Sequence, residues 1–270
     1  MPKAPLLVVI IETPESLRSQ PLLGKFEVDS RFEVVRLPAL MLHTNSDVKK
    51  NKIDTSLDEF AYFEGRLMSP QEIGCAKSHN LARKFVGESL SGGVILEDDA
   101  RIENLDLFYK YALDFLEKKQ GKLAVLSMNE FRVGGTSGFE RKGIQPLLSK
   151  PFLALAYALT PLAAKALYEA NEPISTVADW PRIRIKYFSL FNPLVRHGDG
   201  ENLSTIDIQG ELNRKGLKPS KKISQLIFIT FFSSKPKSIS LVRYIEEVYC
   251  NRITWHLDSA LRRFFKVIFK

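Results

Sequence analysis

The stretch GGVILEDDA, residues 92–100, combines the two features that decide the fold of this 270-residue chain. Its apolar half is typical of a short strand buried on both faces of a largely parallel sheet, and its acidic half follows where that strand ends. In open α/β sheets, ligands bind beyond the carboxyl ends of the strands. Glu97, Asp98 and Asp99 are therefore expected at the edge of the sheet where a ligand would bind.

Strands and helices alternate on both sides of this stretch. Apolar runs predict further strands over residues 6–11, 32–37, 123–128, 152–159 and 185–191. Helical patterns cover residues 70–86, 104–119 and 161–171, and residues 43–66 are expected to form a loop with one short helix. This alternation indicates an α/β sandwich with a mostly parallel central sheet.

The start of the first long helix has a clear capping signal. Ser69 is expected to be the N-cap, with Pro70 at the first helical position and Glu72 at the third. The same helix carries Cys75 and His79 at positions i and i+4, a spacing compatible with zinc. Two ligands do not make a site, and a buried cysteine beside a hydrogen-bonded histidine is the simpler interpretation.

The positive charge is concentrated at the C-terminus. Residues 214–270 contain 13 Lys or Arg and three acidic residues, a net +10, whereas residues 1–213 contain 26 basic and 28 acidic residues, a net −2. We therefore divide the chain into a catalytic domain, 1–215, and a basic amphipathic extension, 216–270. The near-neutral body argues against a nucleic-acid partner.

The extension is expected to form a helical tail with an apolar stripe that includes Leu257, Leu261 and Phe264. A basic amphipathic helix with aromatic residues is typical of an anchor on an anionic membrane surface. The alternative is a helix that packs back onto the catalytic domain and exposes its basic face.

The two cysteines, Cys75 and Cys250, form no disulfide framework, which favours a reducing compartment. The apolar run near the N-terminus ends at Glu12 and Pro14, so a buried strand is expected there and not a signal peptide. No apolar stretch is long enough to span a bilayer. The expected location is the cytoplasm, with peripheral attachment to the inner face of the membrane.

Three consecutive carboxylates repel one another unless a positive group lies among them. A Mg²⁺ or Mn²⁺ ion chelated by a nucleoside diphosphate would meet that need, since both ions favour oxygen ligands. Along an extended strand, Glu97 and Asp99 would share one face and Asp98 would point to the other. An acidic turn with solvated carboxylates is the alternative.

Several motifs in order resemble glycosyltransferase family 25, the enzymes of lipooligosaccharide biosynthesis, related in domain to the collagen galactosyltransferases. They are EIGC (72–75) with Ser78-His79, LEDD (96–99), Tyr157 before the helix at Pro161, Asp179-Trp180 and NLSTID (202–207). The resemblance covers roughly residues 5–210, and the order of the motifs makes it more specific than any single one.

The resemblance implies a GT-A-type fold and an inverting transfer of a hexose from a nucleotide sugar, commonly UDP-galactose, to a lipooligosaccharide, lipopolysaccharide or other surface glycan. Asp99 and Asp98 would then bind Mn²⁺ or Mg²⁺, and His197 could complete the metal site. Asp179 is the candidate base that accepts the proton of the attacking hydroxyl. Trp180 would stack on the acceptor sugar.

The donor-binding candidates are Ser78, His79, Glu97 and Asp98, together with Arg18. The chain departs from the family after its first strand, where Ile11-Glu12-Thr13 and a single Arg18 replace an Asn-Leu and a basic pair. Three alternatives stay open: a donor such as UDP-glucose or UDP-N-acetylhexosamine, an inactive saccharide-binding domain, and a nucleic-acid binder.

Overall fold

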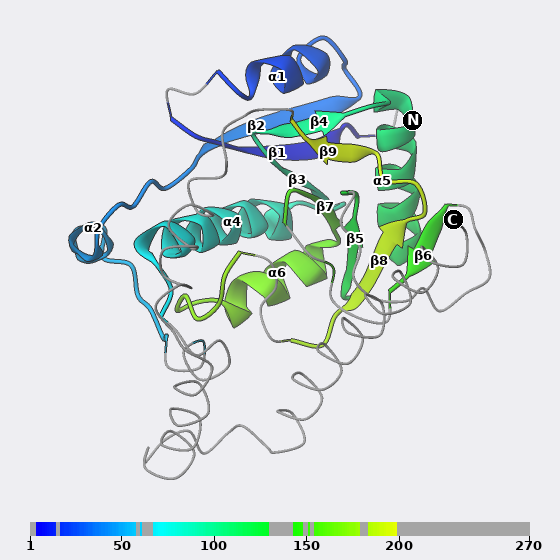
Figure 1. The fold of residues 1–270 in the computed structure, drawn as a ribbon. Coiled ribbons are helices and arrows are strands. Elements are labelled where there is room, and N and C mark those ends of the chain that lie inside the picture. The colour runs from blue at the N-terminus through cyan, green and yellow to red at the C-terminus, as the bar shows by residue number, and fades with distance from the viewer. Residues whose placement is uncertain are drawn as a thin grey trace, which may run out of the picture.

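The computed structural model describes residues 4–14, 17–57, 60, 67–129, 143–147, 151, 154–178 and 183–198. Its centre is a seven-stranded sheet with helices on both faces, and a two-stranded ribbon lies beside it (Figure 1). The strands of the large sheet are β1 (Leu6–Glu12), β2 (Phe32–Pro38), β3 (Gly93–Glu97), β5 (Ala124–Ser127), β6 (Ile144–Pro146), β7 (Ala156–Leu159) and β8 (Lys186–Leu190). The ribbon is made of β4 (Ala100–Ile102) and β9 (Val195–His197). The helices are α1 (Gln20–Phe26), α2 (Asn45–Lys50), α4 (Pro70–Glu88), α5 (Leu105–Lys119) and α6 (Pro161–Ala170).

The central sheet is mostly parallel, as the sequence predicts. Its order is β2-β1-β3-β7-β5-β8-β6. Strand β1 is parallel to β2 and β3, and β5 is parallel to β8. Strand β7 runs antiparallel to both β3 and β5, and β6 runs antiparallel to β8. The carboxyl ends of β1 and β3 therefore lie next to each other, and that edge carries the acidic segment.

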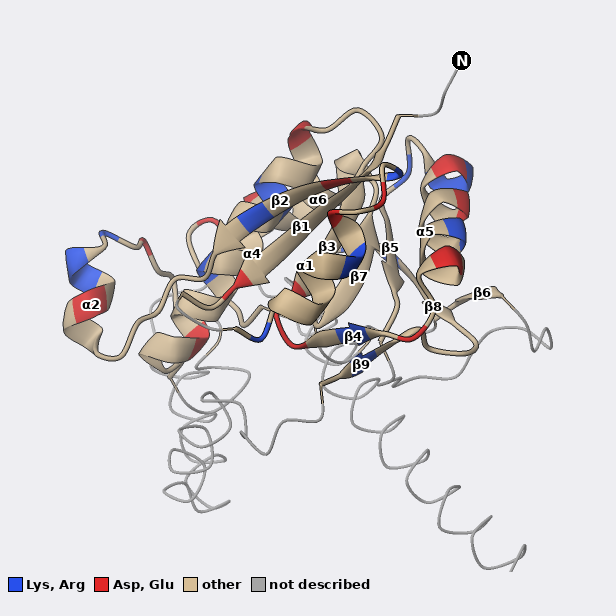
Figure 2. Cartoon of the chain, turned by 90° about the horizontal axis from the view of Figure 1, so that it is seen from above, with Lys and Arg blue, Asp and Glu red and all other residues tan. Residues whose placement is uncertain are grey.

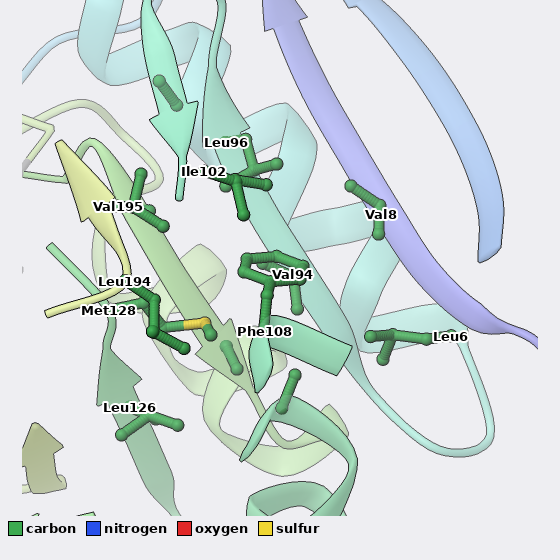
Figure 3. Close-up of a cluster of buried hydrophobic side chains, with 14 of the residues drawn as sticks. Leu6, Val8, Val94, Leu96, Ile102, Phe108, Leu126, Met128, Leu194 and Val195 are labelled. Atoms are coloured by element: carbon green, nitrogen blue, oxygen red, sulfur yellow. The ribbon is translucent and has the colours of Figure 1, made fainter. Parts of the chain in front are cut away.

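The apolar run of β1 is continuous because both faces of the strand are covered. Val8 and Ile10 pack with α1 and α5, while Val9 and Ile11 pack with α4 and α6. Figure 3 shows the first of these layers, in which Val8 and Leu96 from the sheet lie with residues of α5, β4 and β9. The ribbon therefore belongs to the same layer as α1 and α5.

Helix α4 begins as its capping signal predicts. The hydroxyl of Ser69 accepts from the backbone N–H of Glu72, and the carboxylate of Glu72 accepts from the N–H of Ser69. The same helix approaches the segment after β2 closely at Gly74, where an added Cβ would collide with the carbonyl oxygen of Leu40. The capping box fixes where α4 begins, and the close approach at Gly74 fixes how near α4 lies to the segment after β2.

The strands and helices predicted before residue 199 are present with shifts of a few residues, whereas α1, β4, β6 and β9 were not predicted. Figure 2 shows acidic and basic residues together on α2 and on α5, in line with the small net charge of residues 1–213. In the part of the chain that the structure describes, no helix is long and apolar enough to cross a bilayer. The basic tail, 216–270, lies outside the described residues.

Candidate functional site

The acidic segment lies at the carboxyl end of β3, where the strand gives way to a turn. Strand β3 ends at Glu97, and Asp98 and Asp99 form the turn that leads into β4. The alternation of faces expected for an extended strand therefore stops at Glu97. As a result, Asp98 and Asp99 meet the same basic side chain, and Glu97 binds elsewhere.

Arg18, in the loop between β1 and α1, is the residue that Asp98 and Asp99 share. Its Nη2 lies 2.6 Å from Oδ2 of Asp99 and 3.6 Å from Oδ1 of Asp98. The backbone N–H of Thr13 donates to Oδ2 of Asp98 at 3.0 Å. The loop after β1 thus supplies one charge and one backbone donor to the acidic turn.

Strand β9 brings a histidine to the same turn from 98 residues further along the chain. Strand β4 pairs with β9 so that Ala100 lies opposite His197, and the N–H of Gly198 donates to the carbonyl oxygen of Asp99. Nδ1 of His197 then lies 3.4 Å from Oδ2 of Asp99. Three of the sequence candidates, Arg18, Asp99 and His197, are therefore in contact.

Asp99 is held in its charged form. Burial opposes ionisation, but the hydrogen bond with His197 and the charge of Arg18 outweigh it, so the pKa of the Asp99 carboxyl lies below its ordinary value. Its Oδ1 is buried, and no other residue that the structure describes offers it a hydrogen-bond donor. A buried carboxylate oxygen that no other described residue contacts through a hydrogen bond, next to a second carboxylate and an imidazole, fits the ligand preference of a divalent cation.

Glu97 points to helix α4 instead. Oε1 of Glu97 lies 2.9 Å from Nε2 of His79, and Nδ1 of His79 lies 2.9 Å from the hydroxyl of Tyr157 on β7. The guanidinium of Arg83 lies over the Tyr157 ring, 5.9 Å from its centroid. Burial raises the pKa of Tyr157 to about 12, so its hydroxyl keeps its proton near neutral pH.

Ser78 uses its hydroxyl to connect α4 with the segment after β2. The hydroxyl donates to the carbonyl oxygen of Gly74 at 2.8 Å and accepts from the N–H of Leu40, also at 2.8 Å. The side chain is buried. Through these bonds Ser78 holds α4 against the segment after β2. Its predicted contact with the nucleotide-sugar donor stays a prediction.

Asp179 and Trp180 lie outside the described residues. The chain is anchored just before them, because Nη2 of Arg83 donates to the carbonyl oxygen of Ala178. Arg83 thus contacts both Tyr157 and the segment that leads to the candidate base.

The sequence did not single out the residues that fix the loop carrying Arg18. Glu12, the last residue of β1, accepts a hydrogen bond from the hydroxyl of Ser19. It also accepts from Nε and from Nη2 of Arg36, at 2.9 Å in both cases. The hydrogen bond from Ser19, with the charge of Arg36, lowers the pKa of Glu12 despite partial burial. The available signal was the position of Glu12, a carboxylate at the end of a fully apolar strand.

The comparison with known families identifies the family of the chain. A model of glycosyltransferase family 25, described as LPS biosynthesis protein, matches residues 29–180, more than half of the 270 residues. The matched span includes α4, β3 and the acidic turn and ends at Trp180. No curated protein matches the chain. The chain belongs to glycosyltransferase family 25, a family of glycosyltransferases of LPS biosynthesis.

Proposed function

We propose that this protein is an inverting, divalent-metal-dependent hexosyltransferase that moves galactose from UDP-galactose onto a lipooligosaccharide or lipopolysaccharide acceptor. The observation that carries the proposal is a cluster around Asp99: Arg18 lies against both Asp98 and Asp99, and His197 contacts Asp99 from strand β9 of the ribbon. This cluster lies beyond the carboxyl end of β3, where ligands of α/β sheets bind. Family membership supplies the reaction class.

The proposed metal ligands are Asp98, Asp99 and His197. Two carboxylates and an imidazole suit Mn²⁺, and Mg²⁺ could take the carboxylates with retained water. The ion would offset the negative charge that grows on the departing nucleoside diphosphate. The buried Oδ1 of Asp99, which accepts a hydrogen bond from no other described residue, supports this role.

Arg18 is proposed to contact the diphosphate of the donor. Its side chain is 44% exposed, so the guanidinium can turn from the carboxylates toward a phosphate oxygen. A guanidinium binds phosphate oxygens through two parallel N–H bonds. Glu97, His79 and Ser78 complete the proposed donor region, in which His79 holds Glu97 and Ser78 joins α4 to the segment after β2.

Asp179 is proposed as the base and Trp180 as the acceptor platform. As the acceptor oxygen attacks the anomeric carbon and the bond to the diphosphate breaks, the hydroxyl proton passes to the Asp179 carboxylate. The hydrogen bond from Arg83 to Ala178 supports this assignment. It holds Ala178, the residue directly before Asp179, beside the contact between Arg83 and the buried Tyr157.

We further propose that the protein works on the cytoplasmic face of the inner membrane. The net +10 of residues 214–270 supports an electrostatic contact with anionic lipid, worth about 1 kcal/mol per basic residue near the surface. A lipid-linked acceptor would then lie within reach of the catalytic domain.

The test is a donor screen with the full chain. Purified protein is incubated with Mn²⁺, a truncated lipooligosaccharide and each of UDP-galactose, UDP-glucose and UDP-N-acetylhexosamine, and released UDP and product mass are measured. The proposal expects a mass gain of one hexose with UDP-galactose. Transfer from another UDP-sugar alone would correct the donor, and acceptor binding without UDP release from any donor would indicate an inactive saccharide-binding domain.

A further inference from the structure

A second group of metal-ligating side chains lies beside the acidic turn, on the side of helix α4. It consists of Cys75, His79 and Glu97, whose ligand atoms all lie within 4.8 Å of one another. We propose that these three residues bind a Zn²⁺ ion at a site separate from the one formed by Asp98 and Asp99. The inference goes beyond the proposed transfer reaction and does not depend on it.

Two rigid elements place the three ligands. Cys75 and His79 are one turn apart on α4, where His79 is buried and Cys75 is partly buried against the core, and Glu97 is the last residue of β3. Four-coordinate zinc holds its ligand atoms roughly 3.3–3.8 Å apart, given bond lengths of about 2.0–2.3 Å. The observed limit of 4.8 Å and the 2.9 Å between His79 and Glu97 bracket this separation. Side-chain adjustments of about 1 Å would therefore complete the site.

Tyr157 offers His79 the support that zinc-binding histidines have in proteins. A ligating imidazole uses one ring nitrogen for the metal and donates its other N–H to a fixed acceptor. Nδ1 of His79 lies 2.9 Å from the hydroxyl of Tyr157, whose side chain is fully buried. Nε2 is left facing Glu97 and can bind the ion once its hydrogen bond to Oε1 is given up.

The three ligand types determine which metal ion the site prefers. A thiolate, an imidazole and a carboxylate together suit Zn²⁺, whereas Mg²⁺ and Mn²⁺ prefer sites made of oxygen. Binding would release the thiol proton of Cys75. The proton that Nε2 of His79 donates to Glu97 would also have to leave Nε2, so that the metal-bound imidazole carries its proton on Nδ1 and donates it to the Tyr157 hydroxyl. Cys75 and Glu97 are each only partly buried, so an ion can reach them.

The inference gives the three consecutive carboxylates different partners. Glu97 would bind Zn²⁺ on the α4 side of the sheet, while Asp98 and Asp99 would bind Mn²⁺ or Mg²⁺ beside Arg18. Zinc would then join α4 to the end of β3 within the donor region proposed above.

Cobalt binding to the full chain tests the proposal. The purified protein is stripped with a chelator and titrated with Co²⁺ alone, and absorption is recorded in the near-ultraviolet, where a thiolate–cobalt bond gives a charge-transfer band. We expect the band to saturate at one equivalent and to disappear when Zn²⁺ is added. Cys75→Ser should abolish it, and Cys250→Ser, the matched control at the other cysteine, should leave it unchanged.

Two further variants keep the test decisive if Cys75→Ser does not fold. Glu97→Gln changes a partly exposed ligand and should weaken Co²⁺ binding at least tenfold. Tyr157→Phe should weaken it by about 10–100-fold, because it removes the hydroxyl that orients His79. No charge-transfer band in the wild-type protein, or a band that Cys75→Ser retains, would overturn the proposal. Asp99→Ala should keep the band, which separates this site from the one proposed for transfer.

Discussion

Nη2 of Arg18 lies 2.6 Å from Oδ2 of Asp99, so a guanidinium stands beside the carboxylates proposed to bind the divalent ion. The residues come from loops at the ends of adjacent parallel strands, β1 and β3. The same side chain lies 3.6 Å from Asp98. An arginine in this position offsets the repulsion between the two carboxylates and also competes with a cation for them.

Arg18→Gln should change metal binding and donor binding in opposite directions. Loss of the competing charge should tighten Mn²⁺ binding in the absence of donor by about two- to fivefold, the range of a partly exposed ion pair. The KM for the nucleotide sugar should rise, because the diphosphate loses a charged partner. Calorimetric titration with Mn²⁺ and steady-state kinetics measure the two effects.

Arg196→Gln is the matched control, since Arg196 also lies near the site, on β9, but pairs with Glu103. It should leave both quantities unchanged. Weaker Mn²⁺ binding in Arg18→Gln would contradict a competition between arginine and cation.

Asp179→Asn should keep the affinity for donor and Mn²⁺ but lose most of the transfer rate. The amide keeps the shape of the side chain and cannot accept the proton of the acceptor hydroxyl. Loss of a general base costs about 10²–10⁴-fold in rate. If the affinity for the UDP-sugar fell as strongly as the rate, Asp179 would be a donor ligand and not a base.

Gly74→Ala should destabilise the protein by about 1–3 kcal/mol, as overpacking does. The new methyl group would collide with the carbonyl oxygen of Leu40 and push α4 away from the sheet. Gly24→Ala is the control in α1, where nothing lies within 4 Å of the added Cβ. It should stabilise by about 0.5–1 kcal/mol through helix propensity. Denaturant unfolding measures both, and equal effects would contradict the close approach at Gly74.

Truncation after Ser220 should leave transfer to a soluble acceptor largely unchanged, because the motifs of the family lie before it. The shortened protein should no longer bind anionic liposomes. Salt should weaken the binding of the intact chain to liposomes, because it screens the basic residues. Some binding should persist at high salt, because Leu257, Leu261 and Phe264 insert into the apolar part of the membrane. Co-sedimentation with liposomes at increasing salt measures this.

Circular dichroism of the truncated protein distinguishes the alternatives for the tail. Unfolding on truncation would mean that the apolar stripe packs on the catalytic domain. A folded truncated protein that binds liposomes as well as the intact chain would place the membrane contact on the body.

The parts of the fold that the sequence predicted are those with strong local signals. The apolar run of β1 and the capping box of Ser69 and Glu72 each show their structure within a few residues. Helix α1 had a weaker signal: Ser19 and Pro21 suit its start, but no acidic residue follows in the first turn. In the structure the hydroxyl of Ser19 donates to Glu12 and does not cap the helix. Strands β4 and β9, with three residues each, are too short to show a period.

The candidate site was predicted as a set of residue types and not as a set of contacts. The position of Asp99 after a buried strand indicated an acidic site. Its contact with His197 depends on the pairing of β4 with β9, across 98 residues of sequence. The contact of His79 with Glu97 depends on the depth of α4 against the sheet, which Gly74 sets through tertiary packing. Such contacts follow from the assembled fold and leave no local pattern.

The most direct test of the account is the transfer rate of Asp99→Ala with a UDP-sugar donor and Mn²⁺, measured as UDP released in the presence of acceptor. Asp99 has a buried carboxylate oxygen without a donor from any other described residue, and its low pKa keeps it charged. The account predicts that transfer is abolished, that added Mn²⁺ does not restore it, and that the circular dichroism spectrum is unchanged. Turnover near that of the wild type, with the same dependence on Mn²⁺, would contradict the account.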